Sequence, residues 1–232
     1  MQKKLSFLVT FIILISAFAA PSHAACGLED FFKSKTLDLA KVNLSEKKQR
    51  LYFHQESKNC ASGICPTQAY LLSGDEVLSV PSLDADWACS IYVSQKGKAT
   101  MGWLAKSSLK QEVNPQVKSS LLQGQWLYHN SNNQNTLQIE NTSDQQLSLQ
   151  ANLLWFANQE ALKSGSFHDG SFSAKVPSAL ETWKYQGEGA LPSSSCEVEG
   201  HWIYPYLLVK DNKNCGALNV TAQGIYRKAS SI

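Results

Sequence analysis

Runs in which apolar and polar residues alternate recur along most of this chain and limit the folds open to it. One run places Trp87, Cys89, Ile91 and Val93 on a single face, and a longer run does the same for every second residue from Leu147 to Trp155. A period of two is typical of a strand with one buried face. Because short turn-forming segments separate the runs, the sequence predicts an all-β protein with antiparallel sheets.

The segment 51–109 has the spacing of a small barrel. Gly74 lies in a turn between two short β-prone runs, Trp87 opens the next strand, and Gly102-Trp103-Leu104 forms the last one. Together with Gly74-Asp75-Glu76-Val77 and Leu109, these residues resemble the bacterial SH3-like domains of secreted and envelope proteins. The resemblance implies an SH3-like small barrel over 51–112 and a place in the cell envelope.

Aromatic residues beside the first loop of an SH3-like barrel can line a shallow groove for extended peptides. The candidates here are Tyr52, His54, Tyr70 and Tyr92. Related domains often carry Arg-x-Gly-Pro after the first strand, whereas this chain has His54-Gln55-Glu56-Ser57 and then the segment from Cys60 to Cys65. We therefore expect an altered first loop around His54.

A second region of alternating runs covers 120–228 and predicts a domain of roughly eight strands, arranged as a β-sandwich or barrel. Within it, Asp169-Gly170 between Phe167 and Phe172 predicts a hairpin turn. The end of this region, from Asp211 to Arg227, resembles the ends of uncharacterised secreted proteins of Gram-negative bacteria. That resemblance implies no activity.

The first residues of the chain predict export. Lys3 and Lys4 precede an apolar run, and small residues close it up to Ala24. This order is typical of a signal peptide, here 1–24, and predicts a periplasmic or secreted protein. A lipoprotein anchored at Cys26 is the alternative, but His23 stands where a lipobox has an aliphatic residue.

Residues 25–50 follow the predicted cleavage site. Leu28, Phe31 and Phe32 form one helical face, so we expect a short helix and then an extended linker. Loss of 1–24 removes two lysines and no acidic residue, which takes the formal net charge from +2 to zero. No basic stripe remains, so we expect no nucleic-acid partner, and we expect no stable membrane anchor after cleavage.

Six cysteines in an exported chain predict disulfides. Cys196 and Cys215 flank a strand and a turn, and their bridge would close a loop of about twenty residues, worth roughly 3 kcal/mol. Cys89 faces the same side as Trp87, and among the pairings open to it we favour Cys60 or Cys65. A zinc site built from Cys60, Cys65, Cys89 and His54 is the alternative, which ligand spacing and export disfavour.

The run His201-Trp202-Ile203-Tyr204-Pro205-Tyr206 is rich in aromatic rings, half of which must point away from a core if the run is a regular strand. Trp202 and Tyr204 are therefore candidates for an exposed binding patch, and burial beneath a loop is the equal alternative. Glu197 and Glu199 point the same way from one strand, as a pair of catalytic carboxylates would. A solvated strand face explains them more simply and is the favoured interpretation, and a disulfide explains Cys196.

These features predict a non-catalytic exported protein, without cofactor or metal, that binds peptidoglycan or an envelope protein. The alternative is an inhibitor or immunity protein against a cell-wall hydrolase. A third hypothesis, less favoured, is a hydrolase that uses Cys196 or the pair Glu197 and Glu199.

Overall fold

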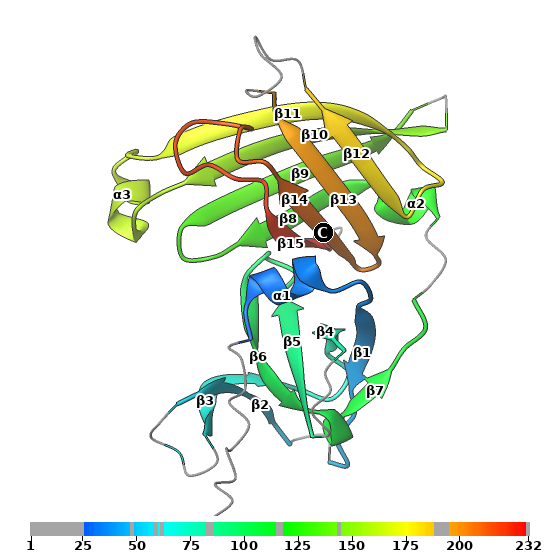
Figure 1. Ribbon diagram of the computed structural model, residues 1–232, viewed down its shortest axis with the longest axis vertical. Helices are drawn as coiled ribbons and strands as arrows, with labels where there is room; N and C mark the ends of the chain where they lie inside the picture. The colour runs from blue at the N-terminus through cyan, green and yellow to red at the C-terminus, as the bar shows by residue number, and fades with distance from the viewer. Residues whose placement is uncertain are drawn as a thin grey trace, which may run out of the picture.

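The computed structural model describes residues 26–46, 49–57, 60, 63–81, 86–114, 118–142, 145–187 and 195–230. The predicted signal peptide, 1–24, lies outside the described residues. Two antiparallel sheets, of seven and eight strands, lie one above the other and confirm the all-β prediction (Figure 1).

The first sheet follows the order β3-β2-β6-β5-β4-β1-β7. Its strands are β1 (Asp38–Val42), β2 (Leu51–Glu56), β3 (Ile64–Leu71), β4 (Glu76–Val80), β5 (Trp87–Val93), β6 (Ala99–Ala105) and β7 (Leu109–Gln111), with a 3-10 turn, η1 (Lys106–Ser108), before β7. Cys89, Ile91 and Val93 are buried as predicted, but Ala88 and Ser90 on the opposite face are buried too, so β5 does not have the single buried face that its alternation predicts. Gly74 adopts a φ of 97° between β3 and β4, a conformation that glycine accepts without steric cost.

The second sheet is an up-and-down meander in the order β11-β10-β9-β8-β15-β14-β13-β12. Its strands are β8 (Gly124–His129), β9 (Asn133–Asn141), β10 (Gln146–Trp155), β11 (His168–Pro177), β12 (Thr182–Gln186), β13 (Glu197–Ile203), β14 (Tyr206–Asp211) and β15 (Gly224–Lys228). Two short helices flank it, α2 (Ser119–Leu122) and α3 (Gln159–Lys163). The end strands β11 and β12 contact each other, so the sheet forms a nearly closed barrel.

Aromatic side chains fill the barrel. The rings of Trp126 and Trp202 lie 5.5 Å apart, and those of Tyr128 and Tyr226 lie 5.6 Å apart. The Tyr226 hydroxyl donates to the Ala222 carbonyl at 2.8 Å, which satisfies its polar end inside the core. The barrel interior is thus a packed core.

Two local expectations are wrong. The expected linker in 25–50 contains β1, which pairs with both β4 and β7 in the first sheet. Asp169-Gly170 is not a hairpin turn but lies inside β11, and Gly170 forms an isolated bridge with Gly216. A Cβ on Gly170 would come within 2.4 Å of the Cys215 carbonyl, so this glycine permits a close backbone approach and not a turn.

The two sheets share a hydrophobic interface between β4 and β5 below and the outer face of β13, β14 and β15 above. Arg227, whose side chain is only 13% exposed, lies within it. Its guanidinium donates to the Val93 carbonyl and the Tyr206 hydroxyl, each at 3.1 Å, and lies 3.4 Å from the Glu76 carboxylate. Burial raises the pKa of Tyr206, which donates to the Glu76 carbonyl. The sheets therefore form one packed unit.

Three disulfides connect the chain, and Cys196–Cys215 forms as predicted. The expected partner of Cys89 is wrong, because Cys89 pairs with Cys26 while Cys60 pairs with Cys65. The reason is the docking of helix α1 (Leu28–Lys33) against β4, which brings Cys26 to β5. Three disulfides indicate an oxidising, extracytoplasmic environment.

Candidate functional site

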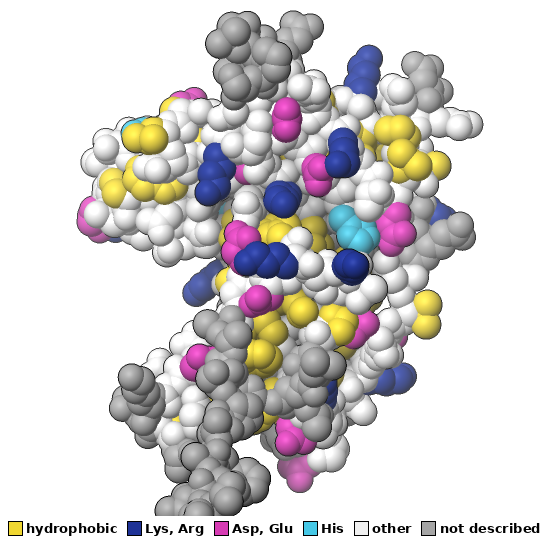
Figure 2. Space-filling view, viewed as in Figure 1, with side chains coloured by type: hydrophobic (Ala, Val, Ile, Leu, Met, Phe, Trp, Pro, Cys, Tyr) yellow, Lys and Arg dark blue, Asp and Glu magenta, His cyan; other side chains and the backbone are white. Residues whose placement is uncertain are grey.

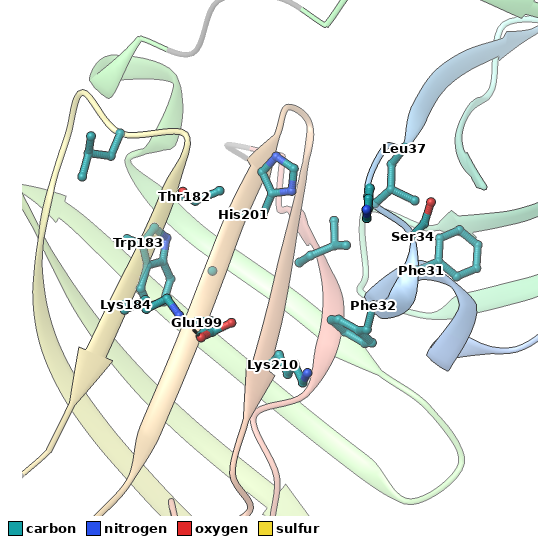
Figure 3. A pocket seen from close by; sticks show the side chains of 14 residues that line it. Phe31, Phe32, Ser34, Leu37, Thr182, Trp183, Lys184, Glu199, His201 and Lys210 are labelled. Carbon is teal, nitrogen blue, oxygen red and sulfur yellow. Dashed lines mark hydrogen bonds and ion pairs between the residues drawn. The ribbon is translucent and has the colours of Figure 1, made fainter. Parts of the chain in front are cut away.

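A groove with a volume of about 420 Å³ lies between α1 and the outer face of β12, β13 and β14 (Figure 3). Phe32 and Leu37 project from the α1 side, and His201 and Lys210 lie on the strands opposite. In Figure 2 the hollow has a hydrophobic floor, with lysine, acidic and histidine side chains around it. The groove is therefore an apolar depression with a charged rim.

Helix α1 is held in place at its N-terminal end and by its buried face. Phe31 is 1% exposed and anchors the helix in the core between the sheets. The backbone N–H of Gly27 donates to the Asp30 carboxylate at 2.8 Å, which caps the first turn. Cys26 is bonded to β5, and the Gln223 amide donates to Glu29 at 2.9 Å from the barrel side. A helix this short needs such tertiary contacts, since alone it would not be stable.

The opposite wall follows from the alternation in β13. Val198, Gly200 and Trp202 point into the barrel, so Glu197, Glu199 and His201 point outward. The imidazole Nε2 of His201 lies 3.4 Å from the Glu181 carboxylate.

A row of charged side chains crosses three strands of this wall. Glu199 is in register with Lys184 on β12 and with Lys210 on β14. The Lys184 ammonium donates to the Glu199 carboxylate, and this bond, reinforced by the charge of Glu199, raises the pKa of Lys184. Lys184 is therefore cationic, and its charge is paired.

A second hollow, of about 520 Å³, continues from the first along the strands and shares Lys184, Glu199 and Lys210 with it. It extends to Gln186 and Glu197. The outer face of β12–β14 therefore offers an elongated depression, long enough for an extended ligand.

The predicted aromatic patch on β13 is wrong in part. Trp202 is fully buried inside the barrel, where its ring also lies 6.1 Å from that of Trp183, because it shares the inward register of Val198. Tyr204, at the turn between β13 and β14, is half-buried and packs against the barrel core. The outward residues of β13 that reach the groove are polar ones.

The structure separates the other predicted binding residues. Tyr52 and Tyr70 are exposed neighbours across β2 and β3, 5.9 Å between ring centroids, with Arg50 over the Tyr70 ring at 4.2 Å. His54 packs against Trp87, with 4.7 Å between the two ring centroids. Tyr52, His54 and Tyr70 lie on β2 and β3, which Figure 1 places far from β12–β14, and none of them lines the groove.

Tyr92, the remaining predicted binding residue, is half-buried beside Arg227, whose guanidinium carbon lies 5.6 Å from its ring centroid. Burial is the main cause that raises its pKa. Tyr92 therefore belongs to the contact between the sheets rather than to a surface shared with Tyr52 and Tyr70.

The residues considered for catalysis have other partners. All six cysteines form disulfides, so neither a Cys196 thiolate nor a zinc site of cysteine thiolates is present. Glu197 and Glu199 share the outward face as predicted, but Glu199 is bonded to Lys184 and Glu197 lies 3.4 Å from the Gln186 amide. Within the described ranges, no three His, Cys, Asp or Glu side chains cluster as metal ligands.

The sequence did not predict a role for the groove residues Lys35, Leu180 and Lys210. They lie far apart in the chain: Lys35 follows α1, Leu180 lies between β11 and β12, and Lys210 lies on β14. One usable sequence feature was the apolar face of α1, because a short amphipathic helix must dock against another element to be stable.

No protein-family model, curated protein or solved structure matches this chain. The SH3-like resemblance of 51–112 therefore stays a prediction. Among the helices that the structure describes, none has the length and apolar character needed to cross a membrane.

Proposed function

We propose that this protein is a non-catalytic binding protein of the bacterial cell envelope, in the periplasm, and that its ligand is the peptide part of peptidoglycan. The groove between α1 and β12–β14 carries the proposal. It combines an apolar floor with polar side chains at the rim, which is the usual composition of a ligand site. Its walls come from sheets and a disulfide-anchored helix, so the site is largely preformed.

Two further features support the envelope setting. The disulfides require an oxidising compartment, and the sequence predicts a signal peptide. The resemblance of the first region to SH3-like domains of envelope proteins points to the same place.

Binding explains the charged residues of the groove better than hydrolysis does. Glycoside hydrolysis needs one carboxyl group in its acid form and a second that is free to act on the substrate. Glu199 instead neutralises Lys184, and both side chains are exposed. Such a pair suits recognition of a polar ligand.

Co-sedimentation of the mature protein with purified insoluble sacculi tests the proposal. We expect the protein to be enriched in the pellet over an unrelated control protein of similar size. Leu180, which is 51% exposed and lines the groove, provides the variant Leu180→Asp. Its matched control is Leu218→Asp, since Leu218 is 75% exposed on the loop after β14 and does not line the groove.

Leu180→Asp should weaken binding about tenfold, because it replaces roughly 1.4 kcal/mol of apolar contact with a solvated charge. Leu218→Asp should bind as the wild type does. Absence of any enrichment would overturn the proposal. Stoichiometric recovery of a wall hydrolase from envelope extract, without sacculus binding, would support an inhibitor or immunity protein instead. Release of wall fragments that is lost in Glu197→Gln would support a hydrolase.

A further inference from the structure

We infer that the groove recognises a carboxylate of its ligand, held between Lys35 and Lys210, with an adjacent apolar group on Phe32 and Leu208. This inference rests on the proposed function, and it names the chemistry by which the groove selects a peptide. Free carboxylates are present on the peptide stems of peptidoglycan.

The charged residues that line the groove leave it with an excess of positive charge. Three lysines and one glutamate line it, namely Lys35, Lys184, Lys210 and Glu199. The bond between Lys184 and Glu199 neutralises one cation with the one anion. Two positive charges remain, on Lys35 and Lys210.

These two lysines have no ion-pair partner among the residues that the structure describes. Lys210 stands in register beside Glu199, but the carboxylate is bonded to Lys184 on the other side. Both lysines are exposed at the rim, so holding them as cations costs little in water. They raise the electrostatic potential of the hollow and favour an anion within it.

The two unpaired lysines lie in the same groove as apolar side chains. Lys35 follows α1 and Lys210 lies on β14, so the two lysines line the groove from its opposite walls. The ring of Phe32, which is half-buried, and the buried Leu208 line the same groove. Figure 3 shows Phe32 projecting toward the strands, above Lys210. A ligand that fits carries a negative charge next to an apolar group.

Among the described residues that line the groove, Glu199 is the one acidic side chain. Glu181 lies 3.4 Å from the His201 imidazole and does not line the groove, and Glu197 lies in the neighbouring hollow. A carboxylate bound between Lys35 and Lys210 would therefore neutralise one of the two remaining positive charges without displacing a described ion pair.

The test uses the whole mature protein and two synthetic forms of the peptidoglycan stem peptide, one with free carboxylates and one with every carboxylate amidated. Binding is measured by calorimetric titration at low and high salt. We expect the free acid to bind at least tenfold more tightly than the amide at low salt, and this preference to shrink as salt screens the lysines.

Charge reversal at the two positions, Lys35→Glu and Lys210→Glu, should each remove the preference for the free acid. Lys175→Glu is the matched control, because Lys175 is equally exposed on β11 and does not line the groove. It changes the net charge by the same amount and should leave binding unchanged. Circular dichroism and the urea midpoint verify that all three variants are folded.

Equal affinity for the free acid and the amide would overturn carboxylate recognition while leaving wall binding intact, provided that sacculi still sediment the protein. Equal weakening by all three charge reversals would also overturn it, since only net charge would then matter. If neither sacculi nor either peptide binds, the proposed function fails together with the inference.

Discussion

The disulfide between Cys26 and Cys89 should contribute more to stability than the disulfide between Cys60 and Cys65. It joins residues separated by 63 positions, whereas Cys60–Cys65 spans a separation of 5. A disulfide acts largely by restricting the unfolded chain, and the restriction grows with the logarithm of the loop length. The perturbation is the double variant C26A/C89A, with C60A/C65A as its matched control.

The chain-entropy relation gives the magnitude. For a loop of 63 residues it predicts about 4 kcal/mol, and for a loop of 5 about 2 kcal/mol. Cys89 is 4% exposed, so alanine at this position also leaves a small cavity where the sulfur was. The expected difference between the two double variants is therefore about 2 kcal/mol or slightly more.

Urea unfolding of the mature protein, followed by tryptophan fluorescence, measures both losses under the same conditions. We expect C26A/C89A to have the lower free energy of unfolding and, because α1 forms one wall of the groove, also the weaker binding to sacculi. A loss in C26A/C89A equal to or smaller than that in C60A/C65A would refute the reasoning. It would mean that α1 and its anchor already fray in the folded protein.

Three further predictions concern the core and the sheet interface. Gly200→Ala should destabilise the protein by about 1–3 kcal/mol in urea unfolding, because a Cβ there would lie 2.1 Å from the Trp183 ring. Gly27→Ala, with its nearest atom at 4.0 Å, should cost less, about 0.5–1 kcal/mol for alanine at the N-cap of α1. Arg227→Ala should cost about 3 kcal/mol by the same measurement, since it removes a largely buried cation and leaves its partners unpaired. Burial raises the pKa of Tyr226 above the ordinary 10.0, so the stability that its neutral phenol provides is complete below pH 10 and is lost as pH rises through the raised pKa. The free energy of unfolding, measured between pH 8 and 11, should therefore fall less steeply with pH in Tyr226→Phe than in the wild type. Equal slopes in the two proteins would contradict a stabilising role of the neutral phenol.

Much of the local structure could be predicted from the sequence. The alternation from Leu147 to Leu153 correctly predicted one buried face of β10, and the count of roughly eight strands in the second region agrees with the eight of the second sheet. The pair Cys196–Cys215 was also predictable, because it closes a short loop around one hairpin. These features depend on residues that are close together in the chain.

The burial of both faces of β13 could not be predicted from the local sequence. Alternation established that Trp202 and Ile203 lie on opposite faces, but both are buried, one in the barrel and the other against the first sheet. The sequence predicted an exposed aromatic face because no local pattern indicates that the first sheet packs over the outer face of β13. Packing of the two sheets buried it.

By itself, the sequence determined the all-β class, which residues share a face of β10, and the disulfide Cys196–Cys215, since each follows from the backbone period of two or from a loop around one hairpin. Only the tertiary structure decided the partner of Cys89, the in-strand role of Gly170 and the groove between α1 and β12–β14. The physical reason is distance along the chain. The walls of the groove meet because two sheets pack through Arg227 and a shared apolar interface, and no periodicity in either segment encodes that packing.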